Sequence, residues 1–253
     1  MTEELKQDPA VSLKSNGEVE VLIYHTHTSE AYMPQFTGFY YTDMETRTQN
    51  QDRSVVAVGE EIKKALDLQM EIFQNDMESL WHNVSTMSIL LSEDMIALLE
   101  DTLQQQGISF EELDGNAEAT KAVEDAMLEP LSQYVRQADC SGAFVVLNTS
   151  LGGEEFRGGL YVQRSNSARI ASDLLLYRGM ADVGRSHGVM PHRKWAQEFH
   201  IGQFPNYAEH TMQAAAPIAD SRRTTDLVTL PGTSEKAVLL TIPMIRADGT
   251  VYG

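Results

Sequence analysis

The chain has 253 residues, which is enough for one large domain or two small ones. Its formal net charge of −18 argues against a nucleic-acid partner, because phosphate binding needs a basic surface. Cys140 is the single cysteine, which excludes an internal disulfide and a cysteine-based zinc cluster. Neither an apolar run of 18 residues nor a signal-peptide pattern is present, and the compartment stays open.

The first part of the chain predicts one strand followed by a polar cluster. Residues 1–17 are polar and indicate a disordered lead-in. The apolar run over residues 19–24 predicts a buried strand, and His25, His27 and Glu30 follow it directly. The two histidines share a face of extended backbone, and Glu30 can reach the same region after a turn. This pattern fits a zinc site, although polar residues at the exit of a strand explain it as well.

A long loop and an amphipathic helix complete this unit. The loop extends to Arg53 and contains aromatic residues, which fits either a ligand wall or packing on the sheet. Ser54 is a suitable N-cap, and Val55, Val58, Ile62 and Leu66 recur at helical spacing. The sequence therefore predicts a strand, a long loop and a helix, which is an α/β arrangement.

Two runs in this region, VLIYHTHTSEAYMP at 21–34 and VVAVGEEIKKAL at 55–66, closely resemble the stage II sporulation protein P family. The resemblance covers residues 18–67 and implies an amidase-like unit of a zinc-dependent peptidoglycan hydrolase. It implies zinc ligation by His25 or His27 and a role for Glu30 as catalytic orienter or ligand. By the same analogy Asp52 is an acidic ligand before the first helix, although a solvated residue near a helix N-terminus explains it too.

The rest of such a hydrolase site is missing from the sequence. The family completes its site with a later strand that ends in histidine followed by Arg-Asp, and no apolar strand here ends that way. His192 and Arg193 follow Pro191 in a polar stretch, which is the wrong context. Catalytic zinc needs three protein ligands and an open position. We therefore predict an incomplete site with little or no amidase activity.

Beyond residue 67 the pattern changes to one long helix. Apolar residues recur at alternating steps of four and three, which predicts a helical seam that ends near Gly107. The seam comprises Phe73, Met77, Leu80, Val84, Met87, Leu91, Met95 and Leu98. Such a seam forms either core or the contact of a homodimer.

Mixed helix and strand signals follow. Residues 117–138 predict a helix that Pro130 interrupts, and residues 142–147 and 160–164 predict neighbouring strands of an antiparallel sheet. Residues 236–253 predict a strand, an Asp-Gly turn and the start of a second strand. The sheet would lack its last strand, so we expect the natural domain to continue further.

A histidine-containing segment at 187–200 invites a metal hypothesis, but its spacing fits no zinc motif. Instead we predict a binding loop in which Arg178, Arg193, Lys194 and Trp195 meet an anionic or amphipathic small ligand. Ordinary loop packing is the alternative.

The runs CSGAFVVL at 140–147, LLYRG at 175–179 and LPGTSE at 230–235 look like extracytoplasmic sensor regions of membrane-anchored, AraC-type regulators. This resemblance spans residues 70–253. It implies an α+β domain of Cache or PAS-like type, with a long N-terminal helix, an antiparallel sheet and an unidentified small-molecule ligand.

Together these patterns predict three segments: residues 1–17, an amidase fragment at 18–67 with peptidoglycan as partner, and a truncated sensor domain at 68–253. The alternative is a sensor domain of a transmembrane transcriptional regulator alone. Both families are membrane-anchored and face outside the cytoplasm, so the lack of an anchor indicates a fragment or a fusion.

Overall fold

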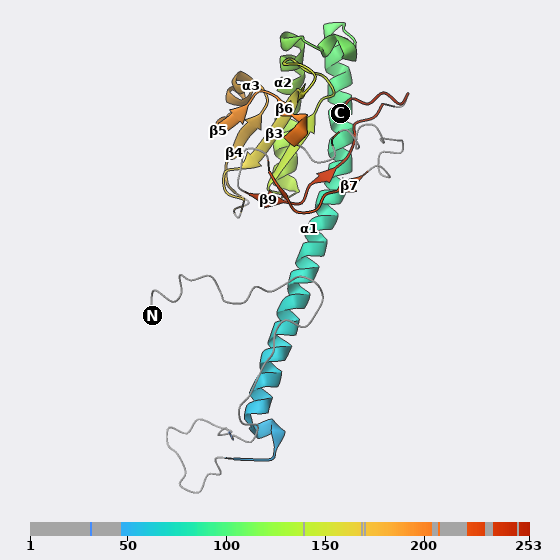
Figure 1. Cartoon of the computed structure of the whole chain (residues 1–253). Coiled ribbons are helices and arrows are strands. Elements are labelled where there is room, and N and C mark those ends of the chain that lie inside the picture. The colour runs from blue at the N-terminus through green and yellow to red at the C-terminus, as the bar shows by residue number, and fades with distance from the viewer. Residues whose placement is uncertain are drawn as a thin grey trace. The chain divides into compact units, whose positions relative to one another are not determined.

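A computed structural model gives the fold, and it describes residue 31 and most of the chain from residue 47 onward. The described residues are 31, 47–138, 140–167, 169, 171–203, 207, 222–230, 235–246 and 248–253. Two compact units divide the chain, Met1–Asp76 and Met77–Gly253. The positions of these two units relative to each other are not determined (Figure 1).

In the described part of the first unit, a short turn leads into a helix. The 3₁₀ turn η2 (Gln51–Arg53) begins at Asn50, whose side chain accepts a hydrogen bond from the backbone N–H of Asp52 at 3.0 Å. Helix α1 (Val55–Gln106) follows, and the Ser54 hydroxyl accepts from the N–H of Val56 at 3.3 Å, as the predicted N-cap requires. The helix continues without a break through Asp67, where the sequence pattern changes.

The second unit contains the later part of α1 and a second long helix. Helix α1 ends before Gly107, which has a φ of 70° that suits glycine. The turn η3 (Phe110–Leu113) leads to α2 (Ala117–Gln137), which begins at the N-cap Asn116.

Pro130 lies inside α2 and does not end it, so the predicted interruption is wrong. Proline inside a helix costs about 3 kcal/mol. The buried face of α2 includes Met127, Leu128 and Leu131, and burying each such side chain contributes roughly 1.5–3 kcal/mol. Tertiary packing therefore outweighs the local cost of the proline.

A four-stranded sheet lies beside these helices (Figure 1). Its strands are β1 (Gly142–Val146), β3 (Gly159–Arg164), β4 (Leu174–Arg178) and β5 (Met190–Ala196), in the order β1-β3-β4-β5. The predicted antiparallel pairing of β1 with β3 is confirmed. Strands β4 and β5 are parallel, and α3 (Ala181–Ser186) connects them.

Gly159 allows the close approach of β1 and β3. Its φ is 129°, and a Cβ at this position would overlap the carbonyl oxygen of Val145. A side chain here would push the two strands apart, so glycine is required at the start of β3.

Three two-stranded ladders complete the described part. They pair β2 (Phe156–Arg157) with β6 (Phe199–His200), β7 (Arg223–Thr224) with β10 (Leu240–Thr241), and β8 (Val228–Thr229) with β9 (Lys236–Ala237). The short turn η4 (Ile201–Gln203) follows β6. The predicted Asp-Gly turn is present, because Arg246 N–H donates to the carbonyl of Thr250 and Ile245 bridges Val251.

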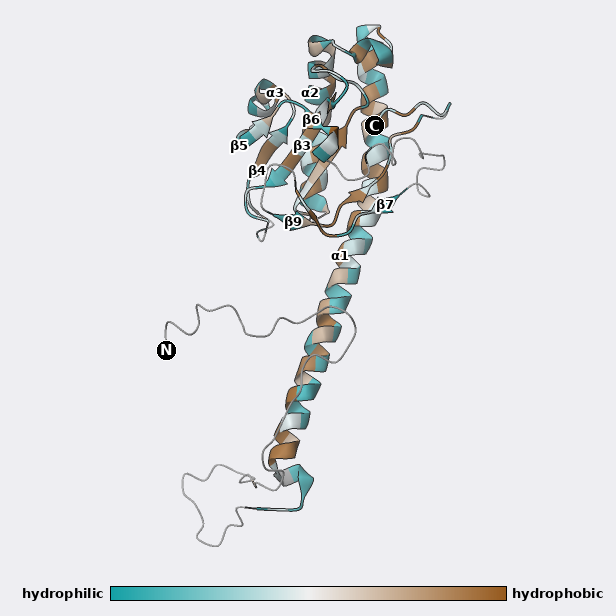
Figure 2. Cartoon of the chain, in the orientation of Figure 1, coloured by the Kyte–Doolittle hydropathy of each residue, from teal (hydrophilic) through white to brown (hydrophobic). Residues whose placement is uncertain are grey.

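The strands of the sheet carry apolar residues (Figure 2), and the buried clusters show that these residues pack on both faces. On one face, side chains of β1, β3 and β4 contact α2 and the 95–103 part of α1. On the other face, Val146, Tyr161, Tyr177 and Phe199 form a smaller cluster. Among the helices of the described part, none is both long enough and apolar enough for a membrane span.

Candidate functional site

Most of the predicted zinc site lies outside the described residues. This holds for His25, His27 and Glu30. Asp52 is described and lies in η2, one turn before α1, with an exposed side chain. The residues that the structure describes contain no cluster of three or more metal-ligating side chains.

The clearest candidate site of the second unit is on the sheet face away from α2. The rings of Tyr161 and Tyr177 lie 5.2 Å apart between centroids, and His192 stacks on Tyr177 at 4.4 Å with an interplanar angle of 22°. We call Tyr161, Tyr177 and His192 the aromatic patch. It comes from β3, β4 and β5, so three neighbouring strands hold its rings.

A chain of polar contacts borders the aromatic patch. The Tyr161 hydroxyl donates to Gln163 Oε1 at 2.7 Å, and Gln163 Nε2 in turn donates to the carboxylate of Glu235. Burial raises the pKa values of both tyrosines, so they are neutral hydrogen-bonding groups at ordinary pH. Burial, with Arg193 and Lys194 nearby, lowers the pKa of His192 and favours its neutral form.

Arg178 places a buried cation next to this patch. Its side chain is only 6% exposed, and Nη1 donates to the carbonyl of Tyr177 at 2.7 Å. Its Nε is buried with no hydrogen-bond partner, and no carboxylate of the described part forms an ion pair with it. Burial lowers the pKa of Arg178, although a guanidinium stays charged near neutral pH.

The other three predicted ligand-binding residues lie on β5, because residues 190–196 form a strand and not a loop. Arg193 and Lys194 are exposed. Trp195 is half-buried, packs against the core on the helix side, and donates from Nε1 to the carbonyl of Gly179 at 2.7 Å. The structure thus gives Trp195 a packing partner and leaves the predicted role in ligand binding untested.

The remaining histidines of this segment each lie near a single carboxylate. His187 Nε2 lies 3.1 Å from Asp125 Oδ1, and His200 Nε2 lies 3.5 Å from Glu155 Oε2. Together with the stack of His192 on Tyr177, these contacts direct the three imidazoles to three different partners.

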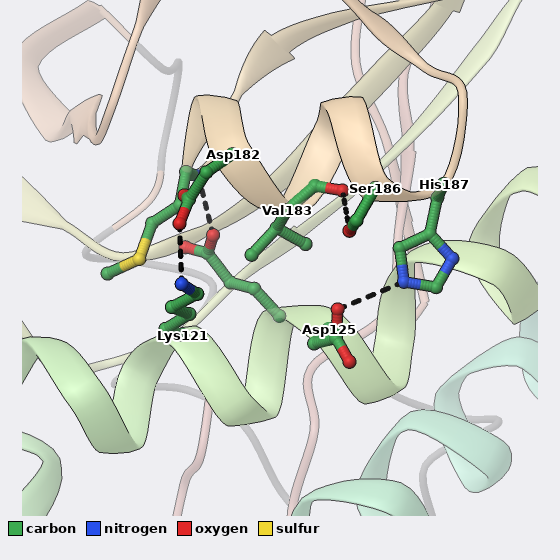
Figure 3. A network of polar contacts seen from close by, with 8 residues as sticks. Lys121, Asp125, Asp182, Val183, Ser186 and His187 are labelled. Carbon is green, nitrogen blue, oxygen red and sulfur yellow. Dashed lines mark hydrogen bonds and ion pairs between the residues drawn. The ribbon is translucent and has the colours of Figure 1, made fainter.

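Sequence analysis missed a polar network between α2 and α3 (Figure 3). Glu124 is 1% exposed, and its carboxylate accepts from the N–H of Met180 at 2.6 Å. Burial raises the pKa of Glu124 to about 8, while backbone N–H groups of Met180 and Gly159 oppose the shift. The Lys121–Asp182 pair, at 2.6 Å, joins the same two helices at the surface. The sequence signal for this network is that Glu124 stands at a position where the helical pattern of α2 otherwise has apolar residues.

Comparison with known proteins finds one match, in the first part of the chain. Residues 2–80 match the family model of stage II sporulation protein P. The match covers His25, His27, Glu30 and Asp52 and extends beyond residue 67. It spans less than a third of the chain, and no curated protein and no solved structure matches. The Cache or PAS-like resemblance of residues 70–253 stays a prediction.

Proposed function

We propose that the chain joins the opening unit of a sporulation-type peptidoglycan hydrolase to a separate ligand-binding domain. The supporting observation is that the family match ends at residue 80, close to the division between the two compact units at Asp76 and Met77. The sporulation-like sequence therefore coincides closely with one unit of the structure.

In the hydrolase unit, the proposed donor set is His25, His27 and Asp52, two imidazoles and a carboxylate that suit zinc. Asp52 is exposed and so accessible to an ion. Zinc would supply Lewis acidity and an activated water. Glu30 would orient that water or complete the donor set. Because the second half of the family's site has no counterpart, we propose little or no amidase activity for this chain.

Incubation of the purified chain with peptidoglycan tests this proposal. We expect no release of stem peptide with added zinc, because the site lacks its later histidine strand. The His27→Ala variant is the matched control and should behave identically. Release by the unchanged chain that is lost in His27→Ala would show a complete site and overturn the proposal.

A second function, binding of an anionic small ligand by the second unit, is favoured by Arg178. A buried guanidinium with a single hydrogen bond in the described part is costly unless an anion compensates it. The aromatic patch offers neighbouring π-faces and a hydroxyl, as in sites for small amphipathic ligands.

Thermal unfolding with a panel of small carboxylates and phosphates tests this function. A binding anion should raise the Tm of the unchanged chain, because only the folded state binds it. Arg178→Gln should abolish the rise, whereas Arg185→Gln, an exposed arginine in α3, should retain it. Equal rises in all three proteins would argue against Arg178 as the anion site.

A further inference from the structure

A cleft in the second unit is lined by uncharged, mostly apolar residues, unlike the site around the Arg178 cation. It lies between α1, β1 and the C-terminal segment at 237–244, and its volume is about 240 Å³. Helix α1 contributes Val84, Met87 and Leu91, and β1 contributes Ala143. All its described lining residues belong to Met77–Gly253, and Arg178 is not among them.

The described lining of the cleft contains no charged side chain. An ionised ligand would lose its hydration there without gaining a partner, which disfavours anions and cations. Close-packed protein interiors leave few voids larger than a water molecule. A cavity of about 150 Å³ already accepts benzene, so this cleft has room for a molecule somewhat larger than one aromatic ring.

One hydroxyl in the cleft is left without a partner. Ser92 is 5% exposed, lines the cleft from α1, and its Oγ makes no hydrogen bond within the described part. Two neighbouring polar groups of the lining differ in this respect. Ser88 Oγ donates to the carbonyl of Ser85 at 2.8 Å, and the Tyr134 hydroxyl donates to Asp94 at 2.6 Å. Buried hydroxyls in proteins are nearly always paired, so an occupant of the cleft is the natural partner for Ser92.

We propose that this cleft binds a small, neutral, largely apolar molecule whose one polar group hydrogen-bonds Ser92 Oγ. The cleft is lined by Tyr161 of the aromatic patch but not by Arg178, so this proposal does not require an anion at Arg178. The apolar walls from α1 and β1 provide most of the contact, and the hydroxyl sets the orientation of the ligand.

Indole and indene are suitable probes, because they share a shape and only indole carries an N–H donor. Binding is measured by titration with calorimetry, with benzoate as the charged control. We expect the unchanged chain to bind indole about fivefold more tightly than indene, the factor that one net hydrogen bond supplies. Benzoate should not bind.

Three variants complete the experiment. Ser92→Ala should bind both probes equally, and Ala143→Leu should bind both more weakly because its longer side chain takes up part of the cleft. Ser132→Ala removes another buried hydroxyl without a described partner, on α2 and outside the described lining, and should bind like the unchanged chain. Circular dichroism confirms that each variant is folded. The proposal is overturned if the unchanged chain binds neither probe, if the preference for indole persists in Ser92→Ala, or if Ala143→Leu binds normally.

Discussion

At the scale of single residues, Glu124 couples folding to pH. Its carboxylate is buried between α2 and the start of α3, where it accepts the N–H of Met180. In the folded protein the pKa of Glu124 is about 8, so the proton leaves only as the pH rises through that value. In the unfolded chain it leaves near pH 4.5. Its stabilising contribution is complete below the lower value and is lost as the pH rises through the higher one.

Replacement of Glu124 by glutamine should reduce this pH dependence. Between pH 5 and 8 the free energy of unfolding of the unchanged chain should fall as the pH rises. The titration of Glu124 contributes at most roughly 1.4 kcal/mol per pH unit to this fall. Glu124→Gln should lack this contribution, because an amide does not titrate. Urea unfolding at several pH values measures the difference. Glu118→Gln, an exposed site on the same helix, is the control. Parallel pH profiles for Glu124→Gln and the unchanged chain would contradict the prediction.

At the scale of elements, α1 carries one apolar stripe in two environments. Steps of four and three continue along it through eight residues: Leu66, Met70, Phe73, Met77, Leu80, Val84, Met87 and Leu91. Met70 and Phe73 are 58% and 61% exposed, whereas Val84, Met87 and Leu91 line the cleft. The predicted seam from Phe73 to Leu98 falls within this helix, because helical spacing is local. Which part faces a cleft depends on strands far along the chain.

The exposed part of the stripe has the spacing of a coiled-coil seam, and we predict that it joins two copies of the chain. Leu66→Glu with Phe73→Glu should shift the chain from dimer to monomer, because at each of the two positions a pair of buried carboxylates would face each other. Light scattering measures the mass. Asn75→Glu with Ser79→Glu adds the same two charges off the stripe and should remain dimeric. A monomeric mass for the unchanged chain would contradict the prediction.

At the scale of the whole molecule, the family match and the division into compact units fall close together in the chain. The match to stage II sporulation protein P ends at residue 80, and the compact units divide between Asp76 and Met77. The sequence predicts the change near residue 67, where the composition shifts. Helix α1 continues past that point because its spacing continues without proline or glycine until Gly107.

The sequence by itself determined features that depend on neighbours along the chain. These are the sporulation-like motif, the long helix, the pairing of β1 with β3 and the Asp-Gly turn. Only the tertiary structure decided that α2 tolerates Pro130, that β5 joins the sheet, and that Glu124 and Ser92 are buried. The physical reason is burial: whether a proline, a carboxylate or a hydroxyl is tolerated depends on groups that approach it from distant parts of the chain.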